Sequence, residues 1–164
     1  MKNFQFLGFP NGDTSKGLQK ISLAQYFDPT NTRYKVLRVN ASAVWCPPCN
    51  EETNAIIAAK AKLDAEGVVI LQTLFDGQTM NVGATETDLR RWIRTHGSNF
   101  DSVLDPGLQN LGGFFNATAI PWNADLDVRT MEILDESLGW GGDILNDVSS
   151  ALDWVATHPP TPAQ

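Results

Sequence analysis

Cysteine, basic residues and long apolar runs are all scarce in this sequence. Its 164 residues include two cysteines, 12 Lys and Arg against 19 Asp and Glu, and a net charge of −7. Two cysteines are too few for a disulfide-stapled scaffold. The acidic balance argues against general binding to nucleic acid or to anionic lipid. No stretch approaches the roughly 18 continuous apolar residues of a membrane span, so we expect none.

The length of the chain fits one domain. Hydrophobic residues make up 42% and charged residues 19% of the sequence, a composition typical of folded rather than disordered chains. We expect a single domain over residues 1–158 and a flexible Pro-rich tail over residues 159–164. Met1–Pro10 does not read as a signal peptide, because Asn3 and Gln5 interrupt its apolar residues. The protein is therefore expected to be either cytoplasmic or a chain given without its export segment.

The hydrophobic pattern alternates between strand-like and helix-like segments. Strands are expected over residues 34–40, 68–75, 100–104, 123–127 and 130–134. Helices are expected from the cysteines to about residue 66, from residue 85 or 87 to the stop at Gly97, and from Asp143 onward. Asn11-Gly12 predicts a two-residue hairpin turn, and residues 22–27 a short helical turn. We therefore predict an α/β fold with a central mixed β-sheet flanked by helices.

The two cysteines form the motif Trp45-Cys46-Pro47-Pro48-Cys49, between a predicted strand and a predicted helix. Cys46 falls at or beside the helix N-cap, where unpaired N–H groups and the helix dipole stabilise a thiolate. Pro47 suits the first helical turn, because its missing N–H needs no partner there. Cys49 follows one turn later on the same side. Cys46 can then attack a substrate disulfide, and Cys49 can resolve the mixed disulfide.

Metal binding is the main alternative for such a cysteine pair. A zinc site usually takes about four ligands, often a second CxxC pair or paired histidines. The only histidines, His96 and His158, are unpaired and distant from the cysteines in sequence. We therefore favour redox chemistry over half a metal site or an inert pair, and we expect no metal. His96, on the apolar side of a helix end, is interpreted as structural.

The sequence around the cysteines resembles the thioredoxin superfamily and, more narrowly, its extracytoplasmic TlpA/ResA-like branch, which is related to the AhpC/TSA redoxins. The branch pattern is a hydrophobic strand followed by Asn-Phe-Trp-Ala-Ser/Thr-Trp-Cys-Pro-Pro-Cys. Residues 39–49 read VNASAVWCPPC, so Asn40 matches the pattern while Ala41 and Ser42 replace its Phe-Trp. Further along the chain, Ile120-Pro121 matches the cis-proline position of the branch.

This resemblance implies a thioredoxin-like fold with an N-terminal β-hairpin and a strand–helix insert. It also implies that Pro121 is cis, faces the cysteines, and leaves the backbone of Ile120 to pair with a bound peptide. Asn40 is expected beneath the cysteines, where it would orient a water for proton transfer from Cys49. The residues assigned to substrate binding are Trp45, Pro47, Pro48, Ile120, Pro121 and Trp122.

The function implied by the resemblance is a thiol-disulfide oxidoreductase that reduces protein disulfides by dithiol–disulfide exchange, with no cofactor. Its partners would be a protein or peptide thiol or disulfide and a redox donor protein. The implied state is a monomer in the periplasm or otherwise outside the cytoplasm, with a role in redox homeostasis or cytochrome c maturation and with any export signal or lipid anchor outside this chain.

Two other functions stay open. One is a thiol peroxidase of the same fold, although Ala43 stands where such an enzyme carries a Thr three residues before its reactive cysteine. The other is a binding module or metallochaperone whose cysteines do not catalyse. A cytoplasmic location also stays open.

Two features predict only a moderately lowered pKa for Cys46. Pro48 has no N–H, so only Cys49 can donate to the Cys46 sulfur, and Glu51 and Glu52 are expected to add negative charge to the first helical turn. A weakly stabilised thiolate favours the disulfide and makes the protein a reductant. A thiolate-specific absorbance titration should give a Cys46 pKa above about 5, since strongly oxidising enzymes lie at about 3.5. A lower value would contradict this reading.

Overall fold

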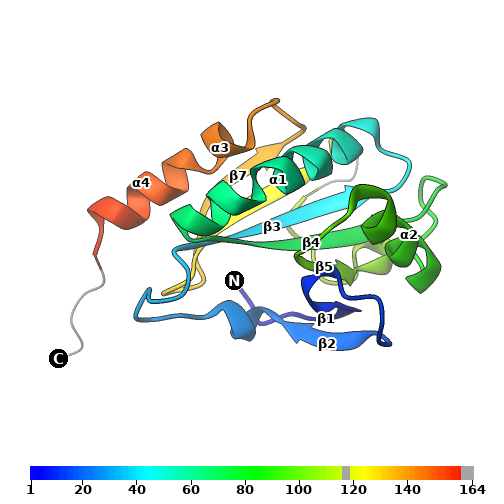
Figure 1. Ribbon diagram of the computed structural model, residues 1–164, viewed down its shortest axis with the longest axis horizontal. Coiled ribbons are helices and arrows are strands. Elements are labelled where there is room, and N and C mark those ends of the chain that lie inside the picture. Colours follow the sequence, from blue (N-terminus) through cyan, green and yellow to red (C-terminus); the bar gives the residue numbers. More distant parts are fainter. Residues whose placement is uncertain (116–118, 160–164) are drawn as a thin grey trace.

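Seven strands form one mixed sheet in the order β2-β1-β5-β4-β3-β6-β7, and the helices pack against it (Figure 1). The computed structural model describes residues 1–115 and 119–159, so residues 160–164 of the predicted tail lie outside the described residues. The strands are β1 (Gln5–Phe9), β2 (Gln19–Ser22), β3 (Val36–Ala43), β4 (Val68–Asp76), β5 (Asp101–Leu104), β6 (Trp122–Asp127) and β7 (Ile133–Leu138). The helices are α1 (Pro47–Glu66), α2 (Glu86–His96), α3 (Ile144–Asp147) and α4 (Ser149–Thr157).

The strand pairing confirms the predicted mixed sheet. β3 lies in the middle, parallel to β4 and antiparallel to β6. β1 and β2 form the expected N-terminal antiparallel pair. The expected strand–helix insert is α2 followed by β5, which pairs parallel with β4 and antiparallel with β1. Within the described residues, no helix is long and apolar enough to cross a membrane.

Local signals set the ends of the two long helices. α1 ends at Glu66, and Gly67 follows with a left-handed backbone at φ 83°. Gly97 ends α2 in the same way at φ 73°, and Thr85 caps the start of α2 by accepting the N–H of Asp88. Glycine adopts a positive φ at little cost, so the helix stops predicted at these two glycines are confirmed.

The hairpin turn predicted at Asn11-Gly12 is wrong. Both residues have a positive φ, 52° and 67°, but they lie in a 3₁₀ turn, and the whole of residues 10–18 joins β1 to β2. The Asn11 N–H donates to a carboxylate oxygen of Asp101 at 2.8 Å, and a Cβ on Gly12 would fall 2.0 Å from the Ser98 carbonyl oxygen. The dipeptide therefore docks on the α2–β5 connection instead of closing a tight hairpin.

The last strand and the last helix also differ from the prediction. β7 spans Ile133–Leu138 rather than residues 130–134, because the chain first turns at Asp127, whose carbonyl accepts the N–H groups of Thr130 and Met131. The C-terminal helix forms where it is expected but divides into α3 and α4 at Val148, whose ψ of −6° departs from helical geometry.

The side chains of β3 and β6 form one polar face and one apolar face. Buried polar residues that hydrogen-bond to one another and to α1 are Arg38, Asn40, Asn123 and Asp125. The alternate positions carry buried apolar residues, namely Leu37, Val39, Ala124 and Leu126. Because successive strand side chains point to opposite faces, the polar set forms a layer beneath α1 and the apolar set forms a core on the other side. A second apolar core lies on the α1 side, where Val36 packs with Ile56 and Leu63.

Trp122, which the sequence assigned to substrate binding, belongs to this apolar face. Its side chain is 2% exposed and stacks on Phe115 with ring centroids 5.0 Å apart. Trp122 pairs with Ala41 of β3, so the strand alternation turns the indole to the face opposite α1. Trp122 therefore packs as a core residue on the face opposite α1.

Replacement of Trp122 by Ala should lower the free energy of unfolding by about 3–5 kcal/mol, the range for losing a buried aromatic side chain. Trp154, which is 47% exposed, is the matched control, and Trp154→Ala should cost no more than about 0.5 kcal/mol. Urea unfolding followed by far-UV circular dichroism measures both. Equal losses in the two variants would contradict the core assignment.

Candidate active site

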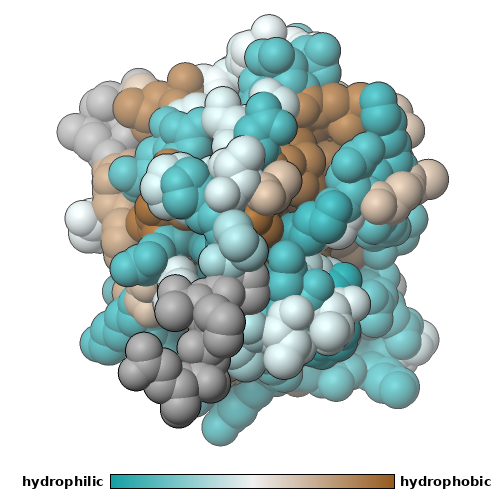
Figure 2. All heavy atoms as spheres, turned by 90° about the vertical axis from the view of Figure 1, so that its left-hand side faces the viewer, coloured by the Kyte–Doolittle hydropathy of each residue, from teal (hydrophilic) through white to brown (hydrophobic). Residues whose placement is uncertain are grey.

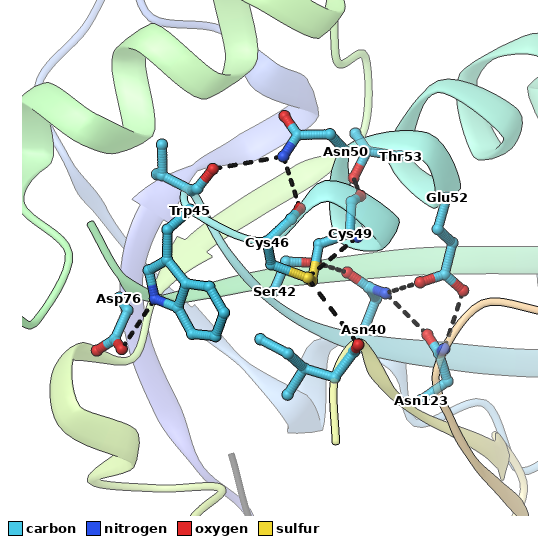
Figure 3. Close-up of a disulfide and its surroundings, with 12 residues drawn as sticks. Asn40, Ser42, Trp45, Cys46, Cys49, Asn50, Glu52, Thr53, Asp76 and Asn123 are labelled. Carbon is cyan, nitrogen blue, oxygen red and sulfur yellow. Dashed lines mark hydrogen bonds between the residues drawn. A yellow bond between two sulfur atoms is a disulfide. The ribbon is translucent and has the colours of Figure 1, made fainter. Parts of the chain in front are cut away.

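Cys46 and Cys49 form a disulfide at the start of α1 (Figure 3). Cys46 is the N-cap residue, and the Cys49 N–H donates to its sulfur at 3.2 Å. Pro47 and Pro48 occupy the first helical positions and carry no N–H. The prediction that Cys49 is the single backbone donor within this turn is confirmed.

Only one of the two cysteines reaches the adjacent groove, which has a volume of about 660 Å³. Cys46 lines this groove although it is only 1% exposed, whereas Cys49 is fully buried and is not among the lining residues. Four of the residues expected to bind substrate also line the groove, and these are Trp45, Pro47, Pro48 and Ile120. The chain therefore presents Cys46 to the outside and keeps Cys49 behind it.

The Ile120-Pro121 peptide bond is cis, as predicted. The Ile120 carbonyl oxygen lies 3.9 Å from the Cys46 sulfur, and the carbonyl of the buried Pro121 accepts the N–H of Gly139 at 2.8 Å. Residues more than 70 positions apart in sequence thus meet at the disulfide.

The indole of Trp45 is held against the end of β4. Its Nε1–H donates to Asp76 at 3.2 Å, and the same carboxylate oxygen accepts the N–H of Asn81 at 2.7 Å. Met80 and Leu138, both well exposed, line the same groove. The groove therefore combines a fixed indole, one satisfied carboxylate and apolar side chains.

Beneath the cysteines lies a hydrogen-bonded set of polar side chains around Asn40 (Figure 3). Asn40 Nδ2 donates to Glu52 Oε2 at 2.7 Å and to Asn123 Oδ1 at 2.8 Å. Asn40 Oδ1 accepts the hydroxyl of Ser42 at 2.6 Å. The expected position of Asn40 in the floor of the site agrees with the structure, and Ser42, which replaces a Trp of the branch pattern, shares that floor.

Glu52 is the site residue that the sequence reasoning misplaced. The sequence predicts that Glu51 and Glu52 add charge to the first turn of α1, but that turn contains no acidic residue. Glu52 is fully buried and accepts hydrogen bonds from Arg38 at 3.3 Å and from Asn123 at 2.9 Å. The spacing from Cys49 indicates the buried position of Glu52. Residues three and four positions after Cys49 lie on the same face of the helix, and these are Glu52 and Thr53.

Burial determines the electrostatics of this floor. It raises the pKa of Glu52 to about 7 and the pKa of Asp125 to about 6, and Arg38 opposes both shifts. Arg38 donates to Asp125 at 2.9 Å and lies 3.7 Å from Asp147. Three carboxyl groups thus share one guanidinium, so the cluster retains a proton at a pH where exposed carboxyl groups are ionised. Among the described residues, no three His, Cys, Asp or Glu side chains gather as a metal site.

The sequence model of the AhpC/TSA family matches residues 3–118. The chain belongs to this AhpC/TSA family. No curated protein matches the chain in sequence. The confirmed thioredoxin-like fold and a Cys46–Cys49 pair at CxxC spacing are those of a thiol-disulfide oxidoreductase.

Solved structures share this fold at low sequence identity. The thioredoxin domain of a thiol-disulfide oxidoreductase from Bacteroides vulgatus has 17% identity and a TM-score of 0.66, over 92% of this chain and 94% of that one. A secreted thiol-disulfide isomerase from Corynebacterium glutamicum has 19% identity and a TM-score of 0.63, over 92% and 84%. AhpC from Enterococcus faecalis has 14% identity and a TM-score of 0.66, over 100% and 96%.

The raised pKa values of Glu52 and Asp125 predict a pH dependence of stability. Between the ordinary carboxyl values and the raised ones, the folded protein binds more protons than the unfolded chain. Free energy of unfolding should therefore fall as pH rises from about 4 to about 7. Glu52→Gln should flatten this fall, while Glu51→Gln at the exposed neighbouring position should leave it unchanged. Urea unfolding of the oxidised protein at several pH values in this range measures the slope. An unchanged slope in Glu52→Gln would contradict the assignment.

Proposed function

We propose that this chain reduces disulfides in polypeptide substrates, with Cys46 as the attacking cysteine and Cys49 as the resolving cysteine. The observation that carries the proposal is the asymmetry of the pair. Cys46 lines the groove and stands at the helix N-cap, whereas Cys49 is enclosed behind it. A thiolate at a helix N-terminus is stabilised by the N–H groups and the dipole of the helix.

The reaction is a two-electron exchange between dithiol and disulfide. The Cys46 thiolate attacks one sulfur of the substrate disulfide, so that a mixed disulfide forms and the other substrate sulfur leaves as a thiolate. Cys49 then loses its proton and attacks the Cys46 sulfur. The second substrate thiolate leaves, and the Cys46–Cys49 disulfide forms. A dithiol donor protein, oxidised in turn, restores the reduced pair.

Glu52 is the group that we assign to the proton of Cys49. Asn40, which is predicted to orient a water, is an amide and does not itself accept a proton at neutral pH. The carboxylate of Glu52 is hydrogen-bonded to Asn40 at 2.7 Å, and burial raises its pKa to about 7. A carboxyl group whose pKa is close to neutral pH can both accept a proton from Cys49 and release it again.

The groove supports a polypeptide substrate rather than a small polar one. The Ile120 carbonyl lies 3.9 Å from the Cys46 sulfur, where it can accept a backbone N–H from an extended chain. Met80 and Leu138 offer apolar contacts, and neither Lys nor Arg is among the described lining residues. We therefore propose substrates with apolar side chains next to their cysteine and without a cluster of acidic residues.

A thiol peroxidase is the second candidate, because AhpC from Enterococcus faecalis has the same fold. The chain carries Ala43 three residues before Cys46, and no Thr or Arg is among the described residues that line the groove. Arg38 is buried against Glu52 and Asp125 instead. These placements favour disulfide exchange over peroxide reduction.

We also propose that the protein acts as a monomer outside the cytoplasm, in redox homeostasis or cytochrome c maturation. The TlpA/ResA-like motif supports this location, and the isomerase from Corynebacterium glutamicum, which has the same fold, is a secreted protein.

Reduction of insulin disulfides tests the assignment of the two cysteines. Cys46→Ser should lower the rate to the background of the reductant alone, because no thiolate then reaches the groove. Cys49→Ser should accumulate a mixed disulfide between Cys46 and a peptide, visible by mass spectrometry. The wild-type protein is the reference. Wild-type activity in Cys46→Ser would overturn the proposal.

The reduction potential and a peroxide assay separate the candidate functions. A reductase should have a potential close to the value of about −270 mV known for thioredoxin, whereas an oxidant lies at about −120 mV. Consumption of hydrogen peroxide without an added disulfide substrate would favour the peroxidase instead. Metal analysis of the freshly reduced protein tests the metallochaperone reading.

A further inference from the structure

His96, the last residue of α2, reaches across to the first turns of α1. Its Nε2 lies 3.1 Å from Asn50 Oδ1, and its Nδ1 lies 2.8 Å from Asn54 Oδ1. The ring is half-buried and packs on Trp92 with centroids 4.4 Å apart. Both ring nitrogens thus face side chains of the helix that carries the cysteines.

Asn50 connects His96 to the backbone of the active site. Its Nδ2 donates to the Cys46 carbonyl at 2.7 Å and lies 3.4 Å from the Val44 carbonyl. Because these two acceptors orient the amide nitrogen, Asn50 Oδ1 faces His96 and accepts the Nε2–H whenever that ring nitrogen carries the proton. The Cys46 carbonyl, the Asn50 amide and the His96 imidazole therefore form one continuous chain of hydrogen bonds.

A second chain of hydrogen bonds joins α2 to the other cysteine. The Trp92 indole donates to Gln72 at 2.9 Å, Gln72 donates to the Thr53 hydroxyl at 2.6 Å, and Thr53 donates to the Cys49 carbonyl at 2.9 Å. The inserted helix α2 is thus connected to the carbonyl groups of both cysteines. This chain contains no titratable group, which leaves His96 as the member that can change its charge.

We propose that His96 is a positioning residue for the redox pair. Through Asn50, it holds the turn at Cys46 in the reduced protein, and it makes the stability of that turn depend on the protonation of its own ring. In the oxidised protein the disulfide itself closes the turn. After reduction only non-covalent contacts hold Cys46 at the N-cap, so the His96–Asn50 contact stabilises the dithiol state more than the disulfide state. This inference rests on the proposed dithiol–disulfide chemistry.

The charge of His96 should respond to the redox state. Burial lowers the pKa of His96 below its ordinary value, and the groups that face its ring, Asn50 and Asn54 from α1 and Trp92 from α2, carry no charge. Reduction places a thiolate on Cys46, the residue whose carbonyl Asn50 joins to His96, and negative charge there favours the imidazolium. Linkage is reciprocal, so protonation of His96 stabilises the thiolate by the same free energy.

Redox equilibrium with glutathione tests the positioning role. His96→Ala should raise the ratio of disulfide to dithiol about threefold to tenfold, the effect of losing one hydrogen bond. A tenfold change corresponds to a potential about 30 mV more negative. His96→Gln, whose amide can still donate to Asn50, should restore the ratio at neutral pH. Its ratio should lack the additional change between pH 5 and pH 7 that protonation of His96 gives the wild type.

His158 is the matched control, because it is the only other histidine in the sequence and its ring stacks on Trp154 at 3.6 Å in α4. His158→Ala should change neither the ratio nor its pH dependence. A purely structural role of His96 predicts lower thermal stability in His96→Ala with an unchanged redox ratio, and that result would overturn the inference.

The histidine ring signals in the proton NMR spectrum give a readout that is independent of activity. The pKa of His96 should be higher in the reduced than in the oxidised protein. Equal His96 values in the two redox states would refute the coupling. If the wild-type pair cannot be reduced and reoxidised at all, the proposed function fails, whereas a reversible pair that ignores His96 removes this inference alone.

Discussion

The buried ion pairs of Arg38 with Glu52 and Asp125 are the interaction on which the rest of the structure depends. Arg38 lies on the central strand β3, Glu52 on α1 and Asp125 on β6, so one guanidinium ties together the three elements that carry the site. Removing one partner from such a buried cluster leaves an uncompensated charge, which is strongly destabilising. This cluster, together with the packing of Ile56 and Leu63 on the sheet, holds α1 over β3 and so holds Cys46 relative to β6.

The same cluster gives the site its inner, proton-holding side. Near the cysteines the helix-facing side of β3 and β6 is polar, and apolar side chains of the same strands pack on the opposite face of the sheet. A carboxyl group with a raised pKa is thereby joined to Asn40 in the floor of the site, while the outer cysteine lines the groove. Figure 2 shows another side of the molecule, seen from the left of Figure 1, where hydrophobic patches lie among hydrophilic residues. The thiol chemistry is instead confined to the end of the sheet where α1 begins.

The elements that were predicted correctly are those defined by nearby residues. Gly67 and Gly97 stop their helices because a positive φ suits glycine, and the Thr85 cap is a contact within three residues. The hairpin turn at Asn11-Gly12 was wrong because its conformation is decided by contacts with Asp101 and Ser98, far along the chain. The start of β7 shifted for a local reason that strand periodicity does not reveal, the turn around the Asp127 carbonyl.

The sequence by itself determined the chemistry of this protein. The motif from Trp45 to Cys49 implies redox cysteines at a helix start, and the pair Ile120-Pro121 is recognisable from its resemblance to the thioredoxin pattern. Only the tertiary structure decided which side chains support that chemistry. Trp122 is buried in the core, Glu52 is hydrogen-bonded to Asn40 in the floor of the site, and Asn50 contacts His96. Each of these placements depends on which face of a strand or helix packs against a distant segment, and a linear pattern does not contain that information.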